Sequence, residues 1–318
     1  MSTITTIDCR YLDRAEFAAA YLLVAGDDVA LVDNNTNSAV PLLLQALERR
    51  GLKPEQVRYL IVTHVHLDHA GATSTLAGLC PQATVIAHPR AARHLVDPAR
   101  LVESASAVYG TEEFARLYGK IEPIAAERVV KVEDNDEIEF GAGKLRFLHT
   151  RGHANHHICI VDSASGSVFT GDAFGLHYPA LQTHGTFAVP STSPTDFEPE
   201  LARQAVRRIS ELQPTRVYPT HFGPVTAVDT AAGQLIRQLD AAEQIMLAAA
   251  ASDCAKEALD EFVRPLLQAH FDELLSRQFA GPELAAAREL LALDIELNAQ
   301  GIAVTAAKHR RQAAPAPV

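Results

Sequence analysis

The sequence predicts an α/β fold followed by a helical C-terminal extension, and three observations support this. Short runs rich in β-branched and aromatic residues alternate with helical patterns through about residue 226. These runs form two groups of strands, each followed by helices, which indicates two βα halves. Beyond about residue 229 no strand pattern remains, and stretches rich in alanine, leucine and glutamate favour helices at 229–251, 254–278 and 282–300.

The chain opens with three predicted strands, at residues 5–9, 18–25 and 29–33. A Gly-Asp-Asp turn separates the second from the third, so we expect a meander. Residues 38–50 then place apolar side chains on one helical face, carry a proline in the first turn and meet Gly51 as a stop signal. An amphipathic helix is therefore predicted there.

A short apolar run at 57–63 predicts a buried strand whose C-terminal end leads into the segment HVHLDHAG. Helical patterns follow at 71–80 and 89–119, with a strand at 84–87 between them. The strand pattern then resumes at 128–132, 137–140, 144–150, 157–161 and 168–170. A helix at about 198–210 and a strand at 216–220 complete the second half.

We therefore expect a first domain at 1–226, formed by the two βα halves, and a helical extension at 227–303. Gly281-Pro282 breaks the last two helices. The tail from 304 to 318 ends in KHRRQAAPAPV, which offers few apolar side chains for packing. It is predicted to be disordered.

The composition favours a folded, cytoplasmic protein. Hydrophobic residues make up 47% and charged residues 21%, a globular balance. A formal net charge of −11 disfavours nucleic acid as a partner. No signal peptide opens the sequence, and no apolar run reaches the length of a membrane span, so we expect no membrane association. The four cysteines are widely spaced and are expected to be buried free thiols.

The segment THVHLDHAG concentrates metal-binding side chains: His64, His66, Asp68 and His69. Histidine nitrogen and carboxylate oxygen are common zinc ligands, and a catalytic site keeps one coordination position open for water. A single HxH pair is usually structural, whereas three imidazoles and a carboxylate directly after a strand are hard to explain by packing.

Further candidate ligands follow other predicted strands. These are His153 in RGH, Asp172 in TGDAF and His221 in YPTHFG. Polar metal-binding groups thus recur at strand ends. With these motifs in this order, residues 17–226 resemble the metallo-β-lactamase superfamily, whose fold is a four-layer αββα sandwich. The motifs are specific for that fold and its metal site, and poorly specific for substrate.

The resemblance implies a two-metal site. His64, His66 and His153 would bind the first metal, and Asp68, His69 and His221 the second, with Asp172 bridging them. Two divalent cations are expected, zinc first, with iron or manganese as alternatives. A metal-bridged hydroxide would attack the substrate, with Asp68 orienting the nucleophile or receiving a proton.

Together with the helical extension, the resemblance is closest to the glyoxalase II-like hydrolases, which implies cleavage of a small thioester or lactone. The glutathione-contacting basic residues of that enzyme have no match here. A secreted β-lactamase is disfavoured because the chain shows no export signal and Asp68 and His69 stand together. A ribonuclease or phosphodiesterase is a weaker alternative, given the acidic balance.

Iron chemistry is the alternative of a different class: a sulfur dioxygenase or an oxygen-handling protein. Oxygen-reducing diiron members usually carry glutamate at the position of His66, which favours the hydrolase. A non-catalytic metal-binding protein is a third interpretation, which the complete ligand set disfavours.

Several further residues are candidates for supporting roles. Asp33, after a strand, matches the family's supporting aspartate, and His157 matches a common family position. The long segment 174–194 is expected to wall the pocket of a small-molecule substrate through His177, Tyr178 and His184. The C-terminal helices would either cap the pocket, pair with another subunit in a homodimer, or pack on their own core.

Overall fold

The computed structural model describes residues 2–192 and 195–313. The chain divides into two compact units. The first comprises Met1–His149, His156–Asp172 and Gln213–Val228, and the second comprises Thr150–Asn155, Ala173–Leu212 and Asp229–Val318. Each unit therefore draws on separate stretches of sequence. The predicted boundary at residue 226 stays a prediction.

The first unit holds two sheets. One sheet has the order β1-β2-β3-β4-β5-β6. Its first three strands form the predicted antiparallel meander, and the remaining neighbours pair in parallel. The bounds are β1 Thr3–Asp8, β2 Ala19–Ala25, β3 Asp28–Val32, β4 Val57–Ile61, β5 Thr84–Ala87 and β6 Val129–Lys131.

The other sheet has the order β11-β10-β9-β8-β7, antiparallel except for the parallel pair of β10 and β11. Its strands are β7 Glu137–Phe140, β8 Gly143–His149, β9 Ile158–Asp162, β10 Ser167–Gly171 and β11 Arg216–Pro219. Parallel pairs in both sheets bring the carboxyl ends of β3, β4, β10 and β11 to sheet edges where side chains can meet.

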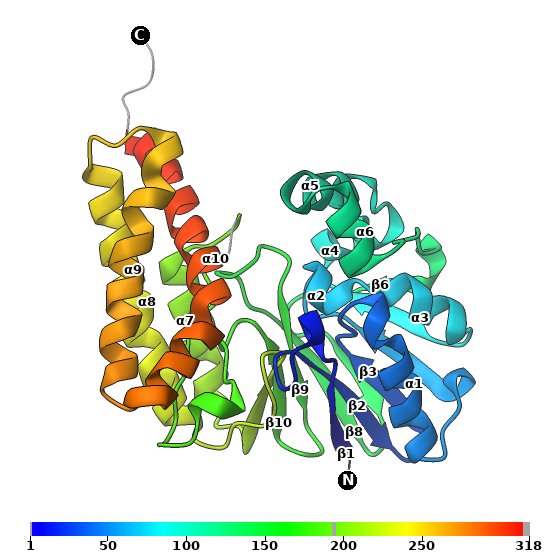
Figure 1. The fold of residues 1–318 in the computed structure, drawn as a ribbon. Helices are drawn as coiled ribbons and strands as arrows, with labels where there is room; N and C mark the ends of the chain where they lie inside the picture. The colour runs from blue at the N-terminus through cyan, green and yellow to red at the C-terminus, as the bar shows by residue number, and fades with distance from the viewer. Residues whose placement is uncertain (1, 193–194, 314–318) are drawn as a thin grey trace. The chain divides into compact units, whose positions relative to one another are not determined.

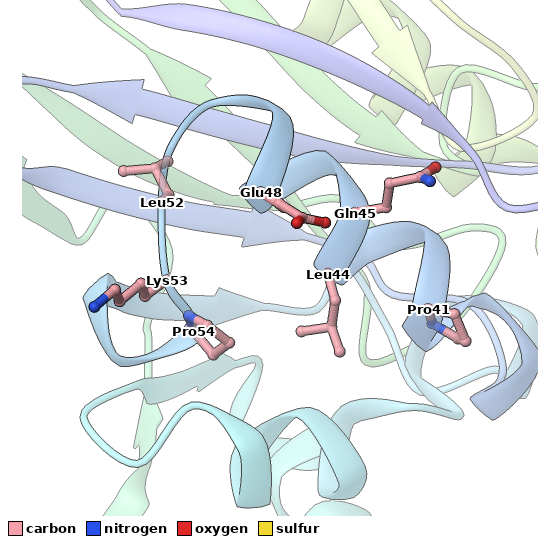
Figure 2. Close-up of a pocket in the computed structure, with 7 residues that line it drawn as sticks. All are labelled: Pro41, Leu44, Gln45, Glu48, Leu52, Lys53 and Pro54. Atoms are coloured by element: carbon pink, nitrogen blue, oxygen red, sulfur yellow. The ribbon is translucent and has the colours of Figure 1, made fainter.

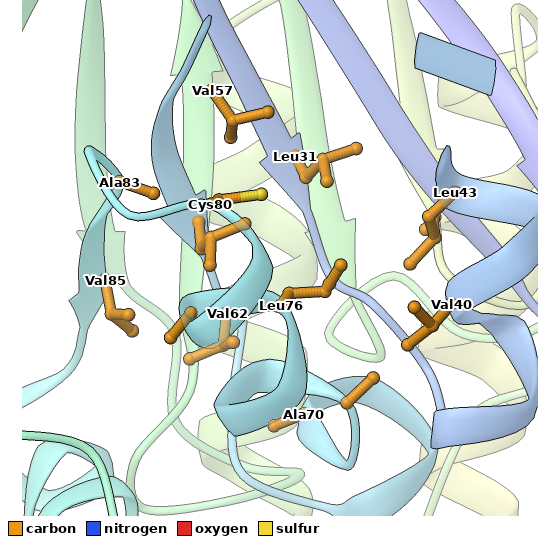
Figure 3. Close-up of a cluster of buried hydrophobic side chains, with 14 of the residues drawn as sticks. Leu31, Val40, Leu43, Val57, Val62, Ala70, Leu76, Cys80, Ala83 and Val85 are labelled. Carbon is orange, nitrogen blue, oxygen red and sulfur yellow. The ribbon is translucent and has the colours of Figure 1, made fainter. Parts of the chain in front are cut away.

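Both faces of the first sheet are buried, which explains why its strands read as continuous apolar runs. Leu23 and Val32 pack in the core that also contains Phe147 and Phe169 of the second sheet. Their neighbours Leu22 and Leu31 belong to the core on the opposite face. Figure 3 shows that second core, in which strand residues meet helix residues such as Leu43 and Leu76.

The helices of the first unit are α1 Val40–Arg49, α2 Leu67–Ala70, α3 Thr73–Leu79, α4 Pro89–Val96, α5 Ala99–Tyr109 and α6 Thr111–Tyr118. The predicted helical stretch 89–119 is thus three helices, because Pro98 and Gly110 interrupt it. A surface pocket lies between α1 and the segment after this helix, lined by residues such as Leu44, Glu48 and Lys53 (Figure 2). None of the candidate metal ligands lines it.

The second unit is helical, with α7 Pro199–Glu211, α8 Val228–Ala251, α9 Leu259–Ser276 and α10 Gly281–Ala313. α9 and α10 run side by side (Figure 1). Side-chain amides of α8 and α10 hold the segment that follows Asp172. Gln238 of α8 donates to the Ala188 carbonyl, and Asn298 of α10 donates to the Pro190 carbonyl. The two-sheet sandwich and the helical extension are as predicted.

The expected disorder from residue 304 onward is wrong as far as Ala313, where α10 ends. Ala306 and Ala307 are buried, so small side chains let this helix pack closely. Arg310 donates hydrogen bonds to carbonyl oxygens of residues in and just after the last turn of α8. Carbonyl groups in the last turn of a helix lack partners within the helix, and the Arg310 guanidinium supplies donors to several of them. Residues 314–318 lie outside the described residues.

α10 also corrects the expectation that no stretch is long and apolar enough to span a membrane. Residues Gly281–Gln312 meet that test by length and composition, with a mean hydropathy of 1.2 over the best window. Since 56% of that window is buried inside the protein, the helix has a core position in its own fold. A single helix that passes this test is weak evidence for a membrane span, because a buried core helix passes it as well.

Candidate metal centre

The candidate ligands of the first unit lie just beyond the carboxyl ends of strands. His64 and His66 follow β4, and the short helix α2 carries Asp68 and His69. Asp172 follows β10, and His221 follows β11. Strand direction and register therefore place side chains from distant parts of the sequence at one edge.

Two groups of these side chains have ligand atoms within 4.8 Å of one another. One contains His64, His69 and Asp172, and the other contains Asp68, His69 and His221. The Nε2 atom of His69 lies 3.3 Å from Asp172 Oδ1 and 3.6 Å from Asp68 Oδ2. His221 Nε2 lies 3.3 Å from Asp68 Oδ2. The structure thus brings five of the seven predicted ligands together.

The donor chemistry of this cluster fits divalent cations. His69 Nε2 is buried and makes no hydrogen bond to any described residue, although two carboxylates face it. Buried polar atoms are seldom left without a partner, and a cation between imidazole and carboxylate ligands would supply one. His66 and Asp68 are partly exposed, so the cluster is open to solvent on one side.

The ring nitrogens of the histidines are arranged for metal binding. His69 Nδ1 donates to Asp33 Oδ2 at 2.9 Å, and His221 Nδ1 donates to the Phe17 carbonyl at 2.8 Å. His64 Nδ1 lies 3.1 Å from Thr63 Oγ1. Each contact occupies Nδ1 and leaves Nε2 as the nitrogen that can bind a cation.

Electrostatics within the cluster favour binding a positive charge. Burial lowers the pKa of His221, but the carboxylates of Asp172 and Asp68 outweigh it and raise that pKa to about 9. The same two carboxylates and Asp33 raise the pKa of His69 well above its usual value against the effect of burial. Burial alone would raise the pKa of Asp68, but His69 and His221 lower it well below its usual range. Without a metal, His69 and His221 therefore hold a proton at neutral pH that a bound cation would displace.

Asp33, predicted to support the ligands, links three strand ends. Its carboxylate accepts from the Thr63 amide at 2.8 Å, from the Thr63 hydroxyl and from His69 Nδ1. The hydroxyl of Thr220, the residue before His221, donates to it at 2.7 Å. Asp33 has a φ of 53°, in the left-handed region that non-glycine residues rarely adopt. Such strained residues persist only where their surroundings fix them, as these four hydrogen bonds do.

Thr63 and Thr220 are supporting residues that the sequence analysis missed. Each stands directly before a ligand histidine at the end of a strand, in THVH and PTHF. That repeated Thr-His pair was the available signal, since a hydroxyl can bond a carboxylate and still accept from a neighbouring imidazole.

His66 and His153 complete the predicted set. His66 Nδ1 lies 3.0 Å from His64 Nε2. His153 belongs to the segment Thr150–Asn155, which forms part of the second unit, where its Nδ1 donates to the Ser191 carbonyl at 3.3 Å. That bond also leaves Nε2 for a metal. The assignment of His153 as a ligand stays a prediction.

The other predicted residues have different surroundings. His157 is buried and accepts a hydrogen bond from the Asp172 amide. Within the second unit, His177 is buried and donates to the Phe174 carbonyl, and Tyr178 donates to Asp294 on α10. His184 has a side chain that is 46% exposed and pairs with Glu283. Their predicted contact with substrate stays a prediction.

Comparison with known proteins agrees with this geometry. A family model described as the metallo-beta-lactamase superfamily matches residues 13–221. The chain is 28% identical over 176 residues to the metallo-beta-lactamase fold-containing protein ST1585 of Sulfurisphaera tokodaii, covering 54% of this chain and 63% of that protein. It is 25% identical over 224 residues to the probable metallo-hydrolase YqjP of Bacillus subtilis, covering 65% and 67%.

A different kind of relative is diflavin flavoprotein A 1 of a Synechocystis species, 28% identical over 158 residues, which cover 49% of this chain and 23% of that protein. Solved structures share the fold at lower identity. A metallo-beta-lactamase family protein from Thermus thermophilus superimposes with a TM-score of 0.67 at 21% identity, covering 98% of this chain and 94% of that one. The structure of ST1585 gives a TM-score of 0.64 at 22% identity, covering 94% and 97%.

Proposed function

Because the chain belongs to the metallo-β-lactamase superfamily, we propose that it is a metal-dependent hydrolase that cleaves a small ester-like bond. The observation that carries the proposal is the cluster in which His69 Nε2 faces the carboxylates of Asp172 and Asp68 without a hydrogen-bond partner among the described residues. Imidazole and carboxylate groups at this separation suit a pair of divalent cations.

The residues divide into two ligand groups. His64, His66 and His153 would hold the first cation, and Asp68, His69 and His221 the second, with Asp172 shared between them. When bound, two such cations supply Lewis acidity and make an attacking hydroxide available near neutral pH.

The protein's own groups orient the reaction. Asp68 is partly exposed, and the neighbouring His69 and His221 lower the pKa of its carboxyl, so it is ionised at neutral pH. Its carboxylate can accept a hydrogen bond from an incoming water and direct that water toward a substrate carbonyl. Asp33 keeps His69 and the residues before His64 and His221 in place, so that the site is preorganised.

Zinc is the metal we propose, since histidine nitrogen and carboxylate oxygen are its usual catalytic ligands. The substrate class we propose is a small thioester or lactone, as in glyoxalase II-like hydrolases. The helical extension supports this subgroup, while the identities to named relatives stay below 30%.

One observation favours a second candidate, an iron-dependent protein that handles oxygen or oxidises sulfur. The match to diflavin flavoprotein A 1 covers about half of this chain. The same ligand types bind iron. Histidine at position 66 favours the hydrolase over this alternative.

Elemental analysis of the purified protein, joined to a hydrolysis screen, tests the proposal. The screen compares thioesters, lactones and phosphodiesters with the metal-loaded and the chelator-treated protein. Two zinc ions with thioester or lactone turnover that chelation removes would support the proposal. Two iron ions with oxygen consumption and no hydrolysis would support the iron candidate instead, and protein that binds no metal would refute both.

A further inference from the structure

His157 is next to the cluster of candidate ligands and contacts two of its members. Its Nε2 atom accepts a hydrogen bond from the Asp172 amide at 3.2 Å. Its ring centroid lies 4.9 Å from that of His64. The side chain is fully buried at 0% exposure. One imidazole thus touches a ligand from β4 and the main chain of the ligand that follows β10.

The surrounding backbone is built closely around this ring. Gly171, directly before Asp172, has a φ of 49°, and an added Cβ would lie 2.5 Å from His157 Nε2 and 2.7 Å from Thr63 Oγ1. The next residue along the chain, Ile158, donates its amide to the Thr63 carbonyl at 2.8 Å. The ends of β4, β9 and β10 therefore meet around His157. Because residue 171 is a glycine, its main chain can lie directly against the His157 ring.

The direction of the hydrogen bond defines what His157 supplies. An amide can only donate, so Nε2 must be the acceptor and carries no proton. His157 is then an acceptor for a buried N–H group, not a ligand candidate through that atom. A buried amide without an acceptor is rare, so this bond constrains the main chain at Asp172.

We infer that His157 is a positioning residue that fixes the main chain of Asp172 and so sets where its carboxylate stands between the two groups of ligands. This rests on the proposed metal site but not on the proposed hydrolysis. Asp172 is the shared member of the site, so a displacement of its main chain would weaken both metal positions. Partners outside the ligand shell commonly contribute 10- to 100-fold in metal affinity, which is about the effect expected here.

Three substitutions separate the acceptor from the shape of the ring. In H157Q the amide oxygen stands as far from Cβ, counted in bonds, as Nε2 does, so it can accept from the Asp172 amide. In H157N the same amide group stands closer to the main chain and cannot reach. H157F keeps a ring of similar size without an acceptor. H270F, on α9 in the second unit, controls for loss of a half-buried histidine.

The measurements are zinc affinity by competition with a chelator and the visible spectrum of the cobalt-substituted protein, with circular dichroism to check folding. We expect H157Q and H270F to bind within about threefold of the wild type, and H157N and H157F to bind about 10- to 100-fold more weakly with a changed cobalt spectrum. Equal affinity in H157N and the wild type would overturn the inference. So would H157Q that folds but binds as weakly as H157N. If H157F does not fold, the glutamine and asparagine pair still decides. Because these readouts need no substrate, they stand even if the protein is not a hydrolase.

Discussion

We expect His177 to contribute to the pH dependence of the protein's stability, and replacing it with phenylalanine should remove that contribution. The imidazole is buried in the second unit and stacks on Phe174, with ring centroids 6.1 Å apart. Its Nε2 donates to the Phe174 carbonyl at 2.9 Å, and its Nδ1 has no hydrogen-bond partner among the described residues. Burial lowers the pKa of His177 from 6.5 to about 4.

The change in unfolding free energy that His177 causes can be worked out from its two pKa values. Between pH 6.5 and 4 the unfolded chain binds a proton at this position and the folded protein does not, so acid favours unfolding. Above pH 6.5, the pKa in the unfolded chain, His177 lowers the free energy of unfolding by nothing. Below about pH 4, the pKa in the folded protein, the loss reaches its full value. The full shift corresponds to roughly 3 kcal/mol, and at pH 5 the wild type should already have lost about 2 kcal/mol.

In H177F an aromatic ring is kept beside Phe174 and the side chain at position 177 does not titrate. Loss of the bond to the Phe174 carbonyl should cost about 1 kcal/mol at every pH. We expect the free energy of unfolding in urea, measured from pH 7.5 to 4.5 on chelator-treated proteins, to be about 1 kcal/mol lower in the variant at pH 7.5. The two curves should cross near pH 6, and the variant should be the more stable protein by about 1.5 kcal/mol at pH 4.5. Chelation removes the separate effect of acid on metal binding.

A matched variant, F174L, disturbs the same packing but leaves the titrating group in place. Its unfolding free energy should run parallel to that of the wild type over the whole range. A constant difference between H177F and the wild type from pH 7.5 to 4.5 would refute the reasoning, because it would mean that His177 titrates alike in the folded and unfolded states.

Three further predictions concern the metal site and α10. D172A should bind less metal and lose turnover while circular dichroism stays close to that of the wild type; full metal content by elemental analysis would contradict the shared-ligand role. Zinc affinity should fall as the pH drops below about 9, because His221 takes up a proton there. Titration calorimetry in buffers of different ionisation enthalpy should detect the protons that zinc binding releases. Zinc binding without proton release would contradict the raised pKa of His221. R310A should lower the free energy of unfolding by about 1.5 to 3 kcal/mol, because a charged donor to the end of α8 is lost. R311A, the next residue of α10, is the control. Equal melting temperatures for the two variants would show that the hydrogen bonds of Arg310 do not stabilise the protein.

The sequence determined the order of elements and most of the ligand set. Strands with apolar runs and helices with apolar faces obey short-range periodicities that can be read without coordinates. His64, Asp68, Asp172 and His221 each come shortly after such a strand, and imidazole and carboxylate groups repeated at strand ends are typical of metal sites. Local pattern and local chemistry were therefore enough to predict two βα halves and a cluster of candidate metal ligands, while the sandwich was predicted from the resemblance of the ligand motifs to the family.

The supporting contacts depended on the tertiary structure. Nothing near Asp33 in the sequence indicates that its carboxylate joins Thr63 to Thr220, because 187 residues separate Asp33 from the latter. The hydrogen bond of His157 to the Asp172 amide likewise arises where separate strands end together. The last turns of α10 look too polar to pack, yet Arg310 finds acceptors on a helix end about 60 residues earlier. Such contacts form between segments that are distant in the sequence and come together only when the protein folds. Patterns among neighbouring residues therefore do not predict them.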